Sequence, residues 1–201
     1  MPTPVFIRAI ASDGLGPVHS GVLHSMYMHF PGFRICAPMT PGEYHEIWND
    51  FMEHDDPMFV SEHRESYDNR EELTDEYHDD ADITLYGISS TRFHLKAAAE
   101  QLAAEGIKCN IVHIVWLKPF TILERYLKPL NSSKLGLVID ASFEICGAAR
   151  SIAYDLTDQT GHPVKALALK DQTKCLNEPL QNLAPGSQEI YDKVKQLLKS
   201  T

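Results

Sequence analysis

The chain of 201 residues is 43% apolar and carries a formal net charge of -10. This length and apolar content suit one large or two small globular domains, and the negative charge argues against binding to nucleic acid or to anionic membranes. No apolar run approaches the roughly 18 residues that a membrane-spanning helix needs, and the first four residues lack the features of a signal peptide. We therefore expect a cytoplasmic protein.

The cysteines are scattered along the chain and form no C-x-x-C pair, which argues against a zinc site and against a disulfide scaffold. We expect buried thiols at all four positions, Cys36, Cys109, Cys146 and Cys175.

An acidic segment divides the chain. From Arg64 to Asp82 there are nine acidic residues and two arginines, a net charge of -7. Such a run repels itself and buries little, so we interpret residues 68–81 as a solvated linker between two domains. A calcium loop is the alternative, but the run lacks the glycine-centred ligand spacing of that motif.

The part before the linker alternates between strand and helix patterns. Thr40-Pro41-Gly42-Glu43 forms a capping box with proline at the first helical position, which predicts a helix to about Glu53. The other expected elements are strands at 5–10, 33–37 and 58–60, a glycine-containing turn at 12–21, and a helix at 22–30 that ends at Pro31-Gly32.

The part after the linker repeats this alternation. Its strands are expected at 83–87, 107–117, 135–140 and 164–169, and its helices at 93–104, 122–127, 145–156 and 187–198. Strands that are apolar on both faces indicate a buried parallel sheet. The predicted fold class is α/β, with two small three-layer α/β units whose sheets are mainly parallel.

Several motifs, taken in order, carry a resemblance to a known family. They are Gly14-Leu15-Gly16-Pro17-Val18-His19-Ser20, Phe30-Pro31-Gly32-Phe33, Pro38-Met39-Thr40-Pro41, Asp55-Asp56-Pro57, Glu62-His63, Asp82-Ile83-Thr84, Ala97-Ala98-Ala99-Glu100, Glu105-Gly106-Ile107, Leu117-Lys118-Pro119, Asp140-Ala141-Ser142-Phe143 and Gly147-Ala148-Ala149. Together they resemble the beta subunit of the E1 component of 2-oxo acid dehydrogenases, of the pyruvate or branched-chain type, in the transketolase superfamily. The resemblance covers nearly the whole chain.

The resemblance implies a division of the chain and a cofactor. Residues 1–67 correspond to the C-terminal half of a pyrimidine-binding domain, and residues 82–201 to a transketolase C-terminal domain. In this family thiamine diphosphate sits between two subunits and acts as the electron sink for decarboxylation of a 2-oxo acid, and the acyl group then passes to lipoamide. The glutamate that activates the cofactor lies in sequence that precedes the segment resembling Val5 to Ile10.

The resemblance also implies partners. The family holds the diphosphate and magnesium with a glycine-aspartate-glycine motif on the alpha subunit, and we assign the superficially similar Ser12-Asp13-Gly14 to a turn. We therefore expect a partial or split subunit that is inactive alone. Its expected partners are a second copy in a homodimer, an E1 alpha-like subunit, a polypeptide that supplies the remaining half of the pyrimidine-binding domain, and an E2 core. The alternative is a noncatalytic dimerisation or interaction module.

His19 is the candidate catalytic residue. Relatives carry a histidine-serine pair here, where the imidazole could orient the substrate carboxylate or assist acyl transfer, and Ser20 would line the substrate channel. The alternative is a histidine that bonds backbone at a helix start. Gly21 stands where relatives carry glutamine, which is a departure from the pattern.

Two ion sites are also considered. Some family members bind potassium after the helix that ends near Phe51, which would give backbone carbonyls of Phe51 and Met52 and the side chain of Asp56 as ligands, although His54 replaces an aspartate there. The stretch 87–90 at a strand end could cradle an anion at a helix start, or be a plain capping turn. The histidines and serines form no hydrolase motif.

Overall fold

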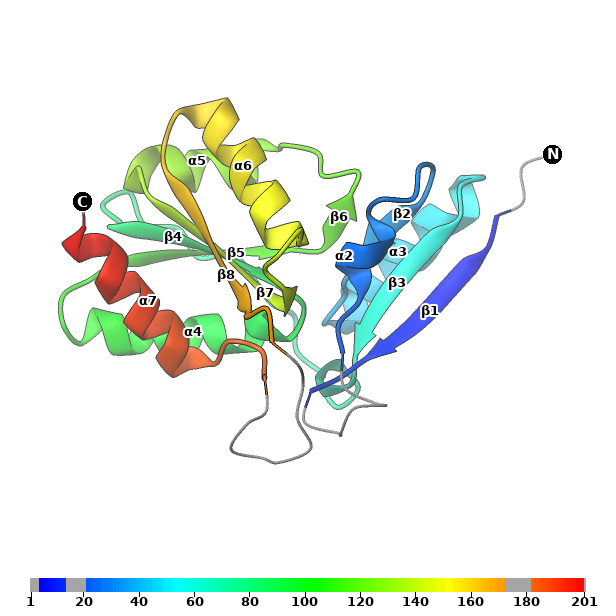
Figure 1. Cartoon of the computed structure of the whole chain (residues 1–201), viewed down its shortest axis with the longest axis horizontal. Coiled ribbons are helices and arrows are strands. Elements are labelled where there is room, and N and C mark those ends of the chain that lie inside the picture. Colours follow the sequence, from blue (N-terminus) through cyan, green and yellow to red (C-terminus); the bar gives the residue numbers. More distant parts are fainter. Residues whose placement is uncertain (1–3, 14–20, 173–181, 201) are drawn as a thin grey trace.

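The computed structural model describes residues 4–13, 21–172 and 182–200. Figure 1 shows two α/β units side by side, each built on its own sheet. Seven of the eight labelled strands have at least one parallel neighbour. The exception is β6, which pairs only with β2 and in the antiparallel direction. The predicted α/β class with mainly parallel sheets is confirmed.

The first sheet has the strand order β1-β3-β2-β6. Its strands are β1 (Phe6–Ala11), β2 (Arg34–Cys36), β3 (Met58–His63) and β6 (Trp116–Lys118). Helix α3 (Pro41–Glu53) covers one face, where Ile47 lies in a buried cluster with residues of β2 and β3. Helix α2 (His24–Tyr27) lies on the other face, where the ring of Tyr27 stacks on Phe59 at 4.2 Å between centroids.

The capping box predicted for α3 is confirmed. The side chain of Thr40 accepts a hydrogen bond from the backbone N–H of Glu43, and the Glu43 carboxylate accepts from the N–H of Thr40. Pro41 opens the helix without loss of a hydrogen bond, because the N–H at that position has no partner inside the helix.

The second sheet has the order β5-β4-β7-β8, and all its pairs are parallel. Its strands are β4 (Ile83–Ile88), β5 (Cys109–Ile114), β7 (Gly136–Phe143) and β8 (Val164–Leu169). Helices α4 (Arg92–Ala103) and α7 (Ser187–Lys199) cover one face, and α5 (Glu124–Ser133) and α6 (Ala148–Thr160) cover the other (Figure 1). From β4 the chain first adds β5 on one side of β4 and then adds β7 on its other side. The direction of the connections therefore reverses, and the topological switch point lies between β4 and β7.

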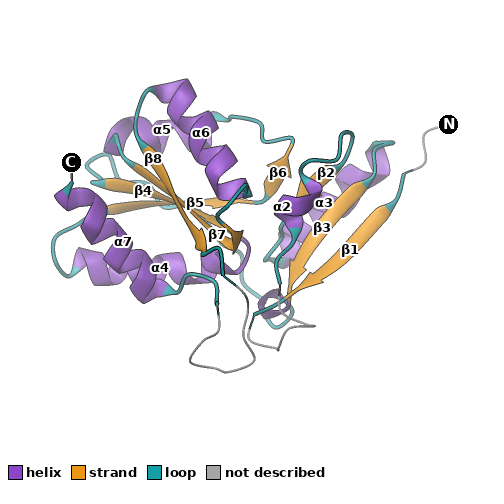
Figure 2. Cartoon of the chain, viewed as in Figure 1, coloured by secondary structure: helices purple, strands orange, loops and turns teal. Residues whose placement is uncertain are grey.

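The prediction of a single strand at 107–117 is wrong, because the structure has two strands there, β5 and β6. The chain leaves the second sheet after β5, and β6 pairs with β2 in the first sheet, as Figure 2 shows. The backbone N–H of Ala37 donates to the carbonyl of Val115 at 2.9 Å, and Leu117 is buried in the core that both units share. Burial of Leu117 between the two sheets explains why the strand turns across the junction.

The helix expected at 22–30 is also wrong, because α2 holds only four residues. The carbonyl of Val22 accepts from the hydroxyl of Ser142, and the side chains of His24 and Ser25 bind residues of the second unit. A helix this short, with no side-chain cap, is held by these tertiary contacts rather than by its own hydrogen bonds.

Strands β3 and β7 each extend three residues beyond the expected end, and two helices also differ from the expectation. Helix α6 begins at Ala148 rather than 145, because Cys146 has a left-handed backbone with φ of 50° and breaks the helical run. Helix α5 continues beyond 127 through Pro129, where burial of Pro129 and Leu130 in the core offsets the lost hydrogen bond.

The expectation that every thiol is buried is wrong at Cys146, which is exposed next to this turn. Cys36 and Cys109 are buried, and burial raises the pKa of the Cys109 thiol to about 12. Cys175 lies outside the described residues.

The acidic segment is mostly exposed, yet hydrogen bonds fix it to both units. The Glu72 carboxylate accepts from the hydroxyl of Thr40 at 2.5 Å and from the N–H of Gly42 at 2.7 Å, which lowers its pKa. Asp75 accepts from the N–H of His113, and Glu76 forms an isolated bridge with Ile111. The segment therefore has a defined course from the first unit to the second.

Candidate functional site

Polar side chains gather where the carboxyl ends of the parallel strands of the two units meet. Strand β3 ends in Ser61-Glu62-His63, and all three residues are buried. Strand β7 carries Asp140 and Ser142 near its end, also buried. Because ligands of open α/β sheets bind outside the carboxyl ends of the strands, this junction is the candidate site.

A buried chain of hydrogen bonds crosses the junction. The Nε2 atom of His24 lies 3.0 Å from Oδ2 of Asp140, and its Nδ1 atom lies 3.3 Å from the hydroxyl of Ser61. His24 and Asp140 are both 0% exposed. The other carboxylate oxygen of Asp140 has no hydrogen-bond partner among the described residues. The order of groups resembles that of a serine hydrolase, but burial of the serine removes any access for a substrate.

Two more hydrogen bonds fix α2 on the second unit. The hydroxyl of Ser142 donates to the carbonyl of Val22 at 2.9 Å, and the N–H of Ala148 donates to the hydroxyl of Ser25 at 3.0 Å. Together with the His24 bond to Asp140, they position the residues that directly follow segment 14–20.

A cleft of about 390 Å³ opens beside these contacts, between α2 and the turn from β7 to α6. Most of its wall is apolar, and the lining also includes the polar side chains of Ser25, His29, Ser142 and Asp171. Its lining consists of Val22, Leu23, Ser25, Met26, His29, Ser142, Phe143, Ile145, Cys146 and Asp171. Its size and its place at a junction of two units suit a small organic ligand or an acyl chain.

A second buried polar network connects α3 to α4. The guanidinium of Arg92 is 1% exposed and forms a bidentate pair with Glu43, with 2.9 Å between Nη1 and Oε2. Its Nε atom lies 3.4 Å from Nδ1 of His113. Burial, and then the nearby charge of Arg92, lower the pKa of His113 to about 3, so this imidazole is neutral at pH 7 and accepts from Arg92.

The candidate catalytic residues His19 and Ser20 lie outside the described residues, as does most of the glycine-containing turn. The residues on either side of that segment are described. Ser12 and Gly21 form an isolated bridge, in which the N–H of Gly21 donates to the carbonyl of Ser12 at 2.8 Å. The roles of His19 and Ser20 stay predictions.

The structure describes all three candidate potassium ligands. Phe51 and Met52 are in the last turn of α3, and Asp56 is exposed in the bend before β3. The carbonyl of Phe51 accepts from the N–H of His54 at 3.3 Å, and the His54 ring bonds the carbonyl of Asp50. His54 thus caps the helix, and the ion site stays a prediction.

The strand end at 87–90 is not a plain side-chain cap. Ser89 has φ of 56°, and the hydroxyls of Ser89 and Ser90 are buried without a partner in the described part of the chain. Thr91 donates instead to the carbonyls of Ile88 and Ile139. Anion binding here stays a prediction. No group of three or more histidine, cysteine, aspartate or glutamate side chains within the described ranges could hold a metal ion.

The sequence interpretation did not single out His24 or Asp140. Both carry a signal that could have found them, because each is a polar residue inside an otherwise apolar stretch. His24 follows Val22-Leu23, and Asp140 ends the run Leu135-Gly136-Leu137-Val138-Ile139. A buried polar residue needs a partner, but sequence alone does not say which one.

A sequence model of the transketolase C-terminal domain matches residues 74–187, which is more than half of the chain. The chain belongs to this family. The match begins inside the acidic segment and includes the whole second sheet and its helices up to the start of α7.

Curated relatives from this family are subunits of oxidoreductases. The chain is 27% identical over 179 residues to the beta subunit of acetoin:2,6-dichlorophenolindophenol oxidoreductase of Cupriavidus necator, which covers 82% of this chain and 52% of that protein. It is 24% identical over 213 residues to the pyruvate dehydrogenase E1 component subunit beta of Gracilaria tenuistipitata, covering 97% of this chain and 66% of that protein. The chain thus spans between about half and two thirds of the length of these relatives.

Solved structures show the same fold. A split-gene transketolase, described as an inactive beta4 tetramer, has a TM-score of 0.76 at 20% identity and covers 97% of this chain and 66% of its own. The transketolase of Campylobacter jejuni has a TM-score of 0.63 at 14% identity, with 97% of this chain and 30% of its own covered. No helix in the part of the chain that the structure describes is long and apolar enough to cross a membrane.

Proposed function

We propose that this transketolase-family chain acts as a beta-type subunit of a thiamine diphosphate-dependent 2-oxo acid dehydrogenase. Residues 1–67 serve as part of the pyrimidine-binding domain, residues 68–81 as the connection, and residues 82–201 as the C-terminal domain. The observation that carries the proposal is the similarity to a pyruvate dehydrogenase E1 beta subunit over 97% of the chain. The chain works in an assembly with a second copy, an alpha-type subunit and an E2 core.

Within this proposal His19 orients the substrate carboxylate or assists acyl transfer, and Ser20 lines the path of the substrate. The cleft supports these roles, because Val22 and Leu23 in its wall come only a few residues after them. The contacts of Val22, His24 and Ser25 fix the start of α2 on the second unit, beside the same cleft.

The cofactor is shared with a partner in this proposal. The resemblance to the family places the glycine-aspartate-glycine motif that holds the diphosphate and magnesium on the alpha subunit. We therefore assign the diphosphate and its magnesium to an alpha-type partner.

A noncatalytic interaction module is the second candidate. It is favoured by the solved split-gene transketolase, since that neighbour is described as an inactive beta4 tetramer and covers 97% of this chain. In this case the fold and the association surfaces serve assembly alone.

Calorimetric titration with thiamine diphosphate and magnesium separates the two candidates. The chain is titrated alone and then with a co-encoded alpha-type partner. Binding that needs the partner supports the dehydrogenase subunit, and absence of binding in both titrations supports the interaction module.

The role of His19 is then tested in the assembled complex. We expect His19→Ala to lower kcat with a 2-oxo acid by about 100-fold or more, in the range of general acid–base groups. His45→Ala, on the exposed side of α3, is the matched control and should leave kcat unchanged. Equal activity of the two variants would contradict the proposed role.

A further inference from the structure

Strand β8 forms an open edge of the second sheet. It pairs with β7 on one side, and no strand pairs with its other side in the described part of the chain. A cleft of about 570 Å³ follows this edge between α6 and α7. Its wall includes Ala153, Tyr154, Val164, Ala166 and Leu197. The ring of Tyr154 is 69% exposed, although an aromatic side chain of this size gains most from contact with another surface.

Backbone groups of β8 point into this cleft. The carbonyl of Pro163 faces β7, where it accepts from the N–H of Gly136 at 3.0 Å. The N–H of Val164 points the other way and donates to the hydroxyl of Thr157 on α6. Because these directions alternate along a strand, the N–H and carbonyl of Ala166 also face the open side. They are available to a further strand.

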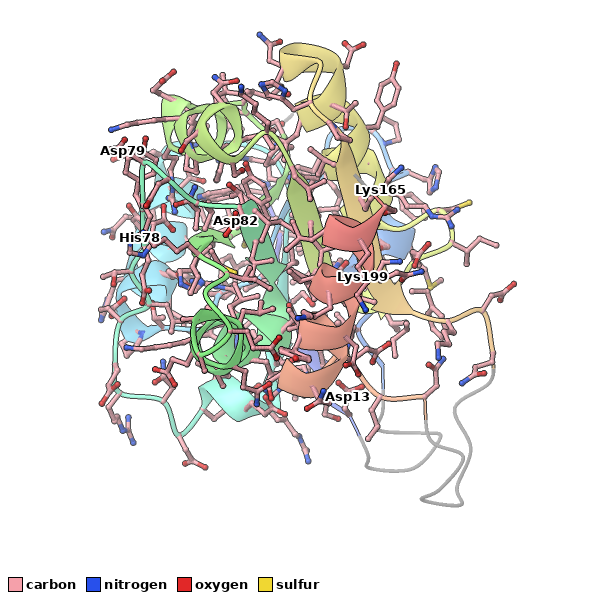
Figure 3. The ribbon with its side chains drawn as sticks, turned by 90° about the vertical axis from the view of Figure 1, so that its left-hand side faces the viewer. Asp13, His78, Asp79, Asp82, Lys165 and Lys199 are labelled. Atoms are coloured by element: carbon pink, nitrogen blue, oxygen red, sulfur yellow. The ribbon has the colours of Figure 1, made fainter. Side chains whose placement is uncertain are left out.

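The cleft is positive on a protein whose net charge is -10. Its charged lining residues are Arg150, Lys165, Lys193 and Glu144, which sum to +2. Glu144 is the only acid among them, and Arg150 already binds it. Lys193 donates to Gln196, and no ion pair of Lys165 occurs among the described residues. Figure 3 shows Lys165 on β8, close to α7.

We propose that the open edge of β8 binds an extended acidic segment of a different polypeptide. The segment adds a strand beside Ala166, places apolar side chains against Tyr154 and Ala153, and places carboxylates against Lys165 and Lys193. Main-chain hydrogen bonds give the affinity in this mode of recognition, and the charges select the partner. A lysine in the middle of an edge strand also discourages pairing with an uncharged or basic strand.

The acidic segment of a second copy is a poor occupant. Three of its carboxylates already have partners inside their own chain, since Glu72 binds Thr40, Asp75 binds Arg125, and Asp80 binds Lys108. Its position 76 is bridged to β5. A separate chain can bring an acidic strand without breaking these contacts.

Fluorescence anisotropy tests this proposal with a labelled seven-residue peptide in which aspartate or glutamate alternates with valine. We expect the double variant Lys165→Glu/Lys193→Glu to bind the peptide at least about tenfold more weakly, because two attractive contacts become repulsive. Two further peptides carry methyl groups on alternate backbone nitrogens, one at the odd and one at the even positions. Only one of the two should lose binding, because only alternate N–H groups of an added strand face β8, and this result distinguishes strand addition from charge attraction alone.

The matched control is Lys96→Glu/Lys128→Glu, with the same charge change on exposed lysines of α4 and α5. It should bind the peptide within about twofold of the parent chain, because screened charges far from a site contribute little. Equal weakening in both double variants, or an unchanged affinity of the first, would overturn the proposal. Light scattering supplies the other contrary outcome: no peptide binding, together with self-association lost in Lys165→Glu/Lys193→Glu, would assign this edge to a second copy.

Discussion

The contact between His24 and Asp140 connects residues that lie 116 positions apart and are fully buried. A hydrogen bond in such a place is worth little in net terms while both partners are present, but removal of one partner leaves the other buried and unpaired. The pair therefore favours the arrangement of the two units in which His24 and Asp140 stay hydrogen-bonded to each other.

We expect Asp140→Ala and His24→Ala each to lower the free energy of unfolding by about 2 to 4 kcal/mol. The double variant should lower the free energy of unfolding by less than the sum of the two single losses, since neither partner is then buried without the other. Urea unfolding followed by circular dichroism measures all three. Glu144→Ala is the control, because the exposed pair of Glu144 with Arg150 contributes at most about 1 kcal/mol. Strict additivity of the two changes would show that the residues act independently.

His113 gives the protein a pH dependence. Its pKa is about 3 in the folded chain, below the usual value of 6.5, because burial and Arg92 disfavour the charged ring. The unfolded chain takes up a proton below about pH 6.5 and the folded chain does not, so this residue destabilises the fold by about 1.4 kcal/mol per pH unit between about 6.5 and 3. Above about pH 6.5 the ring is neutral in both the folded and the unfolded chain, so this loss of stability is absent.

The measurement is urea unfolding at pH 7 and at pH 5, in the parent chain and in His113→Asn. The parent should lose about 2 kcal/mol more than the variant between these two values, because the variant lacks the titrating ring. Equal losses in the two proteins would contradict the shifted pKa.

At the scale of elements, the start of α6 depends on a glycine. A Cβ atom at Gly147 would lie 2.0 Å from the carbonyl oxygen of Phe143, which is backbone and cannot move aside as a side chain could. We expect Gly147→Ala to lower the thermal unfolding temperature and to cost about 2 kcal/mol or more. Gly186→Ala at the start of α7 meets nothing within 4 Å and should cost under about 1 kcal/mol. Similar melting curves for the two variants would contradict this account.

Most elements were predictable from local pattern. The capping box fixed the start of α3, and the run at 164–169 coincides with β8. The failures have a common cause. Residues 22–30 and 107–117 follow an apolar period, but tertiary contacts made by Ser142 with Val22 and by Val115 with Ala37 decide where each element ends. Such contacts join distant parts of the chain and leave no local pattern.

The candidate site was predictable only in part. The series of motifs along the chain pointed to the correct family, but the order of the strands, and with it the switch point, came from the structure. The pairing of His24 with Asp140 could not be predicted, because the same polar residue can be buried against many partners.

At the scale of the whole molecule, strand β1 forms the outer edge of the first sheet, and Ile10 on it is 63% exposed. An apolar open edge favours association with another chain. We expect a dimer or larger assembly at micromolar concentration, measured by light scattering, and a shift towards the monomer in Ile10→Lys. The control Leu123→Lys changes an exposed apolar residue outside the strands. A strictly monomeric parent chain would count against this expectation.

The antiparallel pairing of β6 with β2 also bears on how the chain folds while the ribosome makes it. The fourth strand of the first sheet begins 53 residues after the third one ends, behind a complete β4-α4-β5 passage. Domains usually fold as units in the order of synthesis, but here the leading sheet stays one strand short until residues 116–118 emerge. Until then β2 presents a bare edge, and a pause in translation or a premature stop within that interval exposes a nascent chain that chaperones must protect.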